Sequence, residues 1–268
     1  KQKTAYEIPK RDWNSDVCSS DLWALADLSV NGVDQSGLVL RLERGMTMSG
    51  KIAYEGTTLQ PPADLSRVSL RLTSAANPSG VSISINPSTA QVAADGSFAF
   101  AGVTPGRYLL TATSPSEMSV PGVSWQVKSA QLGGVDAADL PIEIKPGQNV
   151  TGGVLTFTDK VAEVSGTLSD AAGRPTSDFS VILFPVEKSL WYQRSRRLKA
   201  PVRTGTDGKF RFSNLPAGDY YLAALTDFEP SDVSNPAFLD QIAATGAIKI
   251  TVPEGEKKTQ DLKLAGGI

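Results

Sequence analysis

The sequence contains no histidine and a single cysteine, Cys18. Without an imidazole there is no base for Ser-His-Asp or Cys-His catalysis, and without paired cysteines there are no disulfides or thiolate zinc ligands. No apolar run approaches the roughly 18 residues of a membrane-spanning helix. The 26 basic and 28 acidic side chains lack the basic surplus that is typical of nucleic-acid binding. We therefore expect no catalytic residue, metal or cofactor, no nucleic-acid partner and no membrane span.

Residues 1–22 resemble a translated sequencing adapter. The first eight, KQKTAYEI, translate the adapter DNA AAGCAGAAGACGGCATACGAGAT, and residues 12–22, DWNSDVCSSDL, follow the adjoining primer site with one base changed at Asn14. Residues 9–11 occupy the place of the variable index. The alternative is a natural polar N-terminus. We expect this stretch to be non-native and disordered, as for any cloning scar, and the natural protein to be truncated, with any signal peptide or leading domain lying upstream.

The rest of the chain repeats itself. Residues 95–110, DGSFAFAGVTPGRYLL, return as residues 207–222, DGKFRFSNLPAGDYYL. The shorter SGKI of residues 49–52 returns as the SGTL of residues 165–168. Self-similarity at a long period is the mark of tandem structural units.

Two similar units are therefore predicted, residues 45–157 and residues 158–268. The GGVL of residues 152–155 lies shortly before the SGTL of the second unit. The SGLV of residues 36–39 lies in the same way before the SGKI of the first unit. By this correspondence residues 23–44 are the closing strand or strands of a preceding unit. Because they lack a sheet of their own, we expect them to be poorly anchored or paired at an edge of the first unit.

Each unit has the sequence pattern of β-structure throughout. Apolar and polar residues alternate with period two, as in strands that bury one face. The clearest runs are residues 38–42, 68–72, 81–85 and 142–144. Between such runs, the pairs Asp95-Gly96 and Asp207-Gly208 predict two-residue hairpin turns that need positive φ.

Aromatic residues follow these turns at matching places in the two units. The phenylalanines that lie two apart share one strand face and are predicted to point into the core. They are Phe98, Phe100, Phe210 and Phe212. Tyr108 and Tyr220 open the returning strands, where a tyrosine can bury its ring and bond its hydroxyl to nearby backbone, as in the tyrosine corner of sandwich proteins. Trp125 alternates like a strand residue and is predicted to pack inside.

A family resemblance rests on the second unit. Residues 206–220, TDGKFRFSNLPAGDY, together with the opening of residues 164–168 and the AGRP of residues 172–175, resemble the signature of carboxypeptidase regulatory-like domains. The resemblance extends to both units, although the first has Thr104-Pro105 in place of a Leu-Pro pair and a long Ser/Pro-rich middle over residues 73–94. It implies all-β tandem transthyretin-like (prealbumin-like) sandwiches, each a Greek key of about seven strands, with a carbohydrate-binding-like fold.

Two inserts in the second unit depart from the strand pattern. Residues 235–242 predict a short helix, with Asn235 as its cap and Pro236 at its first position. Residues 187–203 contain the candidate ligand-binding side chains. These are Trp191, Tyr192, Arg194, Arg196 and Arg197. Aromatic faces and forked guanidinium groups can stack on sugars or bind carboxylates and phosphates. The alternative is a loop whose rings pack on the sandwich while its arginines stay solvated.

Acidic residues give a weaker signal. Asp227, Glu229 and Asp232 offer oxygen ligands at short spacing, but the glycine-containing calcium loop is missing, so we interpret them as solvated turn carboxylates. No pair of carboxylates is singled out for glycoside hydrolysis.

The function that the resemblance implies is non-enzymatic. The modules are expected to act as structural, spacer or interaction domains of an exported bacterial protein, secreted or held in the cell envelope. The alternative is a carbohydrate-binding module that uses the loop aromatics of the second unit, and a third reading is an accessory part of an enzyme whose catalytic domain lies upstream. A polysaccharide or another protein domain is the expected partner.

Overall fold

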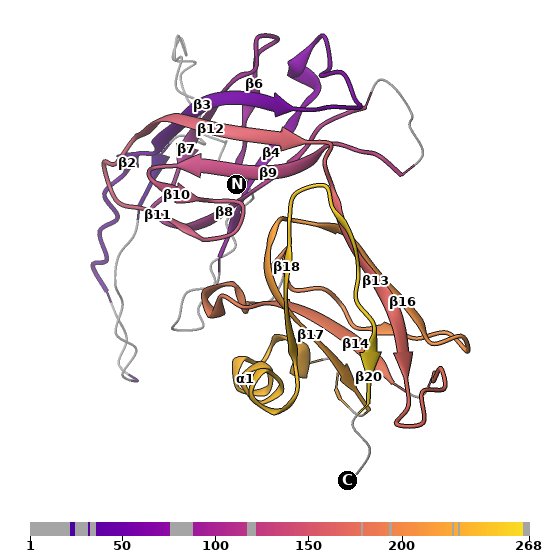
Figure 1. Cartoon of the computed structure of the whole chain (residues 1–268). Helices are drawn as coiled ribbons and strands as arrows, with labels where there is room; N and C mark the ends of the chain where they lie inside the picture. The colour runs from indigo at the N-terminus through magenta and orange to yellow at the C-terminus, as the bar shows by residue number, and fades with distance from the viewer. Residues whose placement is uncertain are drawn as a thin grey trace, which may run out of the picture.

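The computed structural model describes residues 22–24, 32, 36–75, 88–116, 122–177, 179–192, 195–226, 228–229 and 231–264. Strands dominate these residues and pack as two β-sandwiches in tandem (Figure 1), so the predicted all-β fold class is confirmed. The expectations for residues 1–21, for a strand at residues 81–85 and for Asp227 and Arg194 lie outside the described residues. No helix in the described part is long and apolar enough to cross a membrane.

The first sandwich consists of a six-stranded and a four-stranded sheet. The larger sheet has the order β10-β9-β12-β3-β7-β6 and the smaller one β11-β8-β4-β5. Their strands are β3 (Met46–Glu55), β4 (Ser69–Ser74), β5 (Ser88–Thr89), β6 (Gln91–Val92), β7 (Ser97–Val103), β8 (Gly106–Thr113), β9 (Gln126–Leu132), β10 (Val135–Asp136), β11 (Ile142–Ile144) and β12 (Val150–Thr158), with a 3₁₀ turn η2 (Leu65–Arg67).

The second sandwich follows after a three-residue link, residues 159–161. One sheet has the order β16-β13-β19, with β20 also paired to β13, and the other has the order β15-β14-β17-β18. The strands are β13 (Ala162–Ser169), β14 (Ser180–Pro185), β15 (Val202–Arg203), β16 (Lys209–Leu215), β17 (Gly218–Leu225), β18 (Ile248–Val252), β19 (Lys257–Thr259) and β20 (Leu262–Lys263). The helical elements are η3 (Lys188–Leu190), η4 (Asp232–Ser234) and α1 (Pro236–Thr245).

The repeated sequence adopts the same topology twice. In the first sandwich β3 lies between antiparallel β7 and parallel β12, and in the second β13 lies between antiparallel β16 and the parallel pair β19 and β20. In the other sheets β8 lies between β4 and β11 as β17 lies between β14 and β18. The strands predicted at residues 68–72 and 142–144 are confirmed, shifted by a residue in the first case.

The Asp-Gly turns are three-residue loops, so the prediction of two-residue hairpins was wrong. Ala93 and Ser97 close the first loop, and positive φ occurs at Gly96 rather than at Asp95. Such a loop is a type I turn followed by a left-handed glycine. The Asp95 carboxylate accepts from the Ser97 amide at 3.0 Å, and its counterpart Asp207 does the same for Lys209 at 3.1 Å. The aspartate therefore stabilises the turn through its side chain.

The aromatic residues take the predicted places. All four phenylalanines of the repeat are buried. The Tyr108 hydroxyl donates to the Thr104 carbonyl at 2.9 Å and the Tyr220 hydroxyl to the Pro216 carbonyl at 2.7 Å, which confirms a tyrosine corner in each unit. Trp125 is buried and meets the Tyr54 ring edge to face, as expected for packing, although its indole N–H has no hydrogen-bond partner among the described residues.

One insert differs between the sandwiches and accounts for their different outlines. Between β8 and β11 the first sandwich carries the hairpin β9-β10, which extends its sheet beside β12. At the same place the second sandwich carries helix α1, which is capped by Asn235 as predicted. Leu239 and Ile242 of the helix pack against Phe184 and Trp191 on the outer face of β14 and β17.

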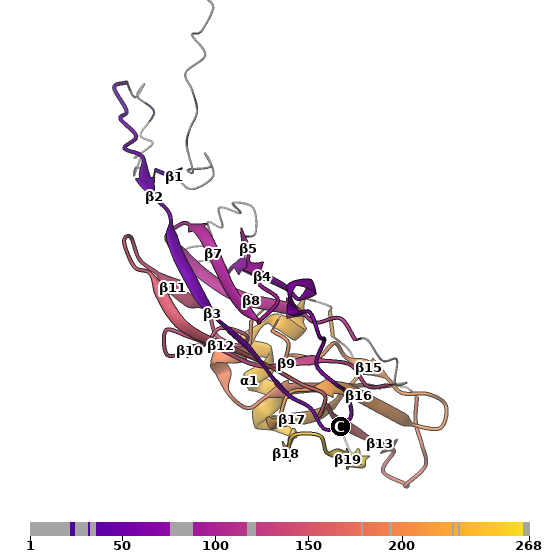
Figure 2. The ribbon, with the colours of Figure 1, turned by 90° about the horizontal axis from the view of Figure 1, so that it is seen from above.

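The described residues before the first sandwich form a separate two-stranded sheet. In it β1 (Leu22–Trp23) pairs with β2 (Glu43–Arg44), and Figure 2 shows both beyond the end of the sandwich strands. Residues 38–42 form no strand, so that prediction was wrong. The alternating pattern remains unpaired, and four of its apolar side chains are exposed. They are Leu38 at 58%, Val39 at 82%, Leu40 at 57% and Leu42 at 65%.

Candidate functional site

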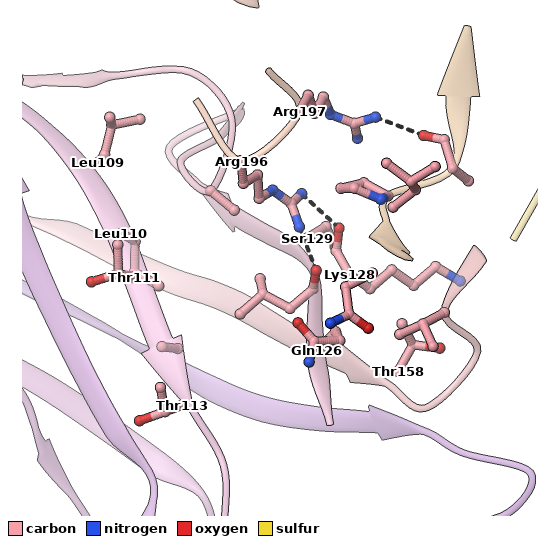
Figure 3. Close-up of a pocket in the computed structure, with 18 of the residues that line it drawn as sticks. Leu109, Leu110, Thr111, Thr113, Gln126, Lys128, Ser129, Thr158, Arg196 and Arg197 are labelled. Carbon is pink, nitrogen blue, oxygen red and sulfur yellow. Dashed lines mark hydrogen bonds between the residues drawn. The ribbon is translucent and has the colours of Figure 1, made fainter. Parts of the chain in front are cut away.

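The predicted ligand-binding loop lies at the junction between the two sandwiches. A groove of about 1120 Å³ runs along this junction and is lined by residues of both units (Figure 3). It lies between β8 and β9 on the side of the first sandwich and the segments 196–199 and 214–217 on the side of the second. The described members of the predicted set differ in how far they reach it.

Trp191 is withdrawn from the groove. Its side chain is only 5% exposed, its indole N–H donates to the Pro185 carbonyl at 2.6 Å, and its ring meets that of Phe184 edge to face. Lys188 covers the ring with its ammonium group 5.6 Å from the centroid. The η3 turn places Trp191 there, since the Glu187 carboxylate caps that turn.

Asp139 of the first sandwich binds the other described residues that were predicted to bind a ligand. The Arg196 guanidinium binds the Asp139 carboxylate through two atoms, Nε at 2.6 Å and Nη2 at 2.9 Å, and Arg197 adds its Nε at 2.8 Å. The Tyr192 hydroxyl donates to the Asp139 carbonyl at 2.7 Å. Asp139 is buried, so this is a shielded and multiply hydrogen-bonded ion pair between the two sandwiches. We call it the Asp139 clamp.

The arginines also bond to backbone on both sides. Arg196 donates to the carbonyls of Val127 and of Lys128, the latter at 3.0 Å, on the edge of β9 (Figure 3). Arg197 donates to the Ala217 carbonyl of its own sandwich at 2.7 Å. Burial favours a neutral Asp139, but the hydrogen bonds and charges of the two arginines outweigh it and hold the pKa of Asp139 below its ordinary value.

A second set of contacts crosses the junction at Glu254. Its carboxylate accepts from the Lys128 ammonium at 2.9 Å and from the Thr158 hydroxyl at 2.9 Å. Lys128 also binds Glu55 at 2.5 Å. Burial opposes ionisation of Glu254, but these two donors more than compensate and lower its pKa. Contacts from both the Asp139 clamp and Glu254 therefore fix the junction.

The link itself is fixed by Asp159. Its buried carboxylate accepts from the backbone amides of Thr57 at 2.9 Å, Thr58 at 2.6 Å and Leu59 at 2.7 Å. Burial raises the pKa of Asp159, but the three amides outweigh this and bring it below the ordinary value.

Sequence reasoning missed Asp139, Asp159 and Glu254. Each lies in a loop or turn, and no spacing distinguishes it from the other acidic residues of the sequence. Arg196 and Arg197 were singled out because they are clustered, which was the available signal. Their use as ligand-binding residues stays a prediction.

Comparisons with known proteins give no family. No family model and no curated protein matches the sequence. Solved structures with some likeness include the minor pilin GBS52 of Streptococcus agalactiae, with 12% identity and a TM-score of 0.33 over 82% of this chain and 95% of that one. The major pilin BcpA of Bacillus cereus has 8% identity and a TM-score of 0.29 over 81% of this chain and 99% of that one. The shaft pilin SpaA of Lactobacillus rhamnosus GG has 10% identity and a TM-score of 0.28 over 83% of this chain and 99% of that one. At such identities and scores the likeness supports no conclusion about function.

Among the described residues no group of three or more acidic, cysteine or histidine side chains could hold a metal ion. The carboxylates at the junction bind arginine, lysine, hydroxyl and amide donors of the chain itself. The chemistry of this site is therefore that of a charge-stabilised joint beside a groove.

Proposed function

We propose that the chain is a rigid pair of non-catalytic β-sandwich modules that spaces and orients neighbouring parts of an exported bacterial protein. The Asp139 clamp carries this proposal. A buried charge is costly unless it is paired and hydrogen-bonded, so a clamp of this kind stabilises one relative orientation of the sandwiches and disfavours others. The short link and the hydrogen bonds of Asp159 also restrict the relative orientation of the sandwiches.

The resemblance to carboxypeptidase regulatory-like domains supports the same role. Both units combine the Asp-Gly turn, the paired phenylalanines and the tyrosine corner in one topology. Modules of that family are accessory domains of secreted or envelope proteins, from which we infer the location of this one. The domain limits of residues 45–157 and 158–268 and the assignment of residues 23–44 to a preceding unit are part of the proposal.

The carbohydrate-binding alternative gains no support. Sugar stacking needs an accessible aromatic face, and Trp191 presents none because Phe184 and Lys188 cover it. Tyr192 is half-buried and its hydroxyl is engaged by Asp139. Tyr192 lines the groove, whereas Trp191 does not. We therefore place recognition in the groove and not on an exposed aromatic face.

Substitution of Asp139 tests the rigid pair. Asp139→Asn keeps the size of the side chain but leaves two half-buried arginines without their counter-charge. We expect each sandwich to stay folded while their relative orientation loosens, because the clamp binds across the junction and not within either core. Small-angle scattering should require a single shape for the parent chain and a spread of shapes for the variant, with NMR dipolar couplings showing separate alignment of the two sandwiches.

Asp240→Asn is the matched control, because Asp240 forms an exposed ion pair with Lys188 away from the junction. It should leave both measurements unchanged. If Asp139→Asn kept a single alignment for both sandwiches, the clamp would not set their orientation and the proposal would fail.

A further inference from the structure

The groove at the junction is formed by strand edges. Residues 109–114, including most of β8, and residues 124–129, including the start of β9, line it without interruption. Successive side chains of a strand point to opposite faces of its sheet. A continuous run of residues can therefore line a groove only where the strand presents its edge, and here the edges of the two sheets of the first sandwich face the same space.

One of these edges is already covered by the protein. The Arg196 guanidinium donates to the Val127 and Lys128 carbonyls on the open side of β9. Capping of this kind prevents strand addition, as edge protection does elsewhere. β9 is therefore closed at this point.

The edge of β8 is open beyond Leu110. On the side away from β4, β11 pairs with β8 only from Gly106 to Tyr108, and the Leu110 amide then donates to the Ala137 carbonyl at 2.7 Å. Two residues further along the strand, the Ala112 backbone amide and carbonyl point the same way. No described strand pairs with them there. An extended polypeptide can use these groups as a template for main-chain hydrogen bonds.

Charge decides what kind of polypeptide fits. Six cationic residues and one acidic residue line the groove, although the whole chain has a net charge of −2. The cations are Arg107, Lys128, Lys160, Arg196, Arg197 and Lys199. Even after the clamp and the pairing of Lys128 with Glu55 and Glu254, positive charge remains in excess.

Lys199 is the cation best placed to receive a ligand. It is half-buried, and among the described residues its ammonium group has one hydrogen bond, to the Asn214 carbonyl at 3.0 Å. Burial, and then the charges of Arg196 and Arg197, lower the pKa of Lys199. An ammonium group can donate three hydrogen bonds, so two remain to be offered.

We propose that the groove binds an acidic, extended segment of a partner polypeptide, which adds to the open edge of β8 and places carboxylates against Lys199. The open backbone amide and carbonyl of Ala112 favour a polypeptide, and the positive lining favours acidic side chains. The proposal rests on the rigid pair proposed above, since the groove exists only while the sandwiches keep their arrangement.

Binding of model peptides to the full chain tests this. The probe is a short peptide of alternating glutamate and valine, and its counterpart has lysine in place of glutamate. We expect the glutamate peptide alone to bind by calorimetry, with an affinity that falls as salt rises. In NMR hydrogen exchange, the Ala112 amide should become protected when the peptide is bound. Lys199→Gln should weaken binding about tenfold or more, as the loss of a charged hydrogen bond implies.

Lys257→Gln is the matched control, since Lys257 is exposed on β19 outside the groove, and it should bind as the parent does. Scattering on the same samples reports whether the sandwiches keep their arrangement. If they keep it and the glutamate peptide does not bind, the groove proposal fails while the rigid pair stands. Equal binding of the lysine peptide, or unchanged binding by Lys199→Gln, would also overturn it. So would tighter binding of polygalacturonate without protection of Ala112, which would indicate a polysaccharide site.

Discussion

At the scale of single residues, the important side chains of this protein are carboxylates that bind across long stretches of sequence. Asp159 in the link bonds to three consecutive amides about a hundred residues earlier, and Asp139 bonds to the loop that contains Arg196 and Arg197. Such contacts cannot be predicted from local sequence, because the partners are brought together only by packing. The tyrosine corners are different: donor and acceptor are four residues apart, so Tyr108 and Tyr220 were predictable.

Asp159 gives a prediction for pH. In the folded state its pKa is lowered, so its contribution to stability is fully present above the ordinary aspartate value of about 3.9 and is lost as pH falls through the folded-state pKa. Asp159→Asn removes the negative charge of the side chain. It also replaces one carboxylate oxygen, an acceptor, with an NH₂ group, a donor that cannot bond to the backbone amides it faces. We expect a loss of about 1 to 3 kcal/mol near neutral pH. The difference from the parent should shrink below about pH 4.

Denaturant unfolding between pH 2.5 and 7 measures this difference. The exposed Asp240→Asn serves again as control and should follow the parent at every pH. A destabilisation of Asp159→Asn that stayed constant down to the lowest pH would show that the charge is not what the three amides recognise.

At the scale of elements, two glycines explain why the short SGKI and SGTL repeats exist. Gly50 pairs with Phe98 and Gly166 with Phe210 across neighbouring strands. A Cβ on Gly50 would lie 2.3 Å from the Gly153 carbonyl oxygen and 2.7 Å from the Phe98 ring. A Cβ on Gly166 would lie 2.0 Å from the Gln260 oxygen and 2.8 Å from the Phe210 ring. The glycine therefore leaves room for the aromatic ring and for the parallel strand on the other side.

Gly166→Ala should consequently destabilise the second sandwich by about 1 to 3 kcal/mol, the usual cost of overpacking. The contact is with backbone on one side, so a rotamer change alone cannot relieve it. Thermal unfolding measures the loss. Gly246→Ala is the control, because a Cβ at Gly246 meets nothing within 4 Å. Equal melting temperatures for the two variants would contradict this account of the repeat.

The strands themselves were predictable to differing degrees. Alternation located β4 and β11 because each buries one face against a single core. The same alternation at residues 38–42 gave a wrong prediction. An alternating segment forms a strand only where a sheet is present for it to pair with. Helix α1 was predictable because Asn235 and Pro236 are local start signals.

At the scale of the whole molecule, the exposed apolar segment before the first sandwich leads to another prediction. Residues 1–44 contribute no described strand to either sandwich, so their deletion should leave the melting temperature of the sandwiches unchanged. It should also reduce self-association, because exposed neighbouring apolar side chains favour it. Calorimetry and sedimentation at several concentrations test both parts. A lower melting temperature would show that the segment is part of the first sandwich.

The sequence by itself determined the all-β class, the twofold repetition, the positions of the Asp-Gly turns and the aromatic core, because these depend on periodicity and on contacts between residues close in the chain. Only the tertiary structure decided how the two sandwiches meet. The Asp139 clamp, the Asp159 anchor and the groove beside Lys199 bring together residues that lie more than 50 positions apart. Packing of complete sheets brings such residues together, and no local pattern specifies which loop of one sandwich will face which edge of the other.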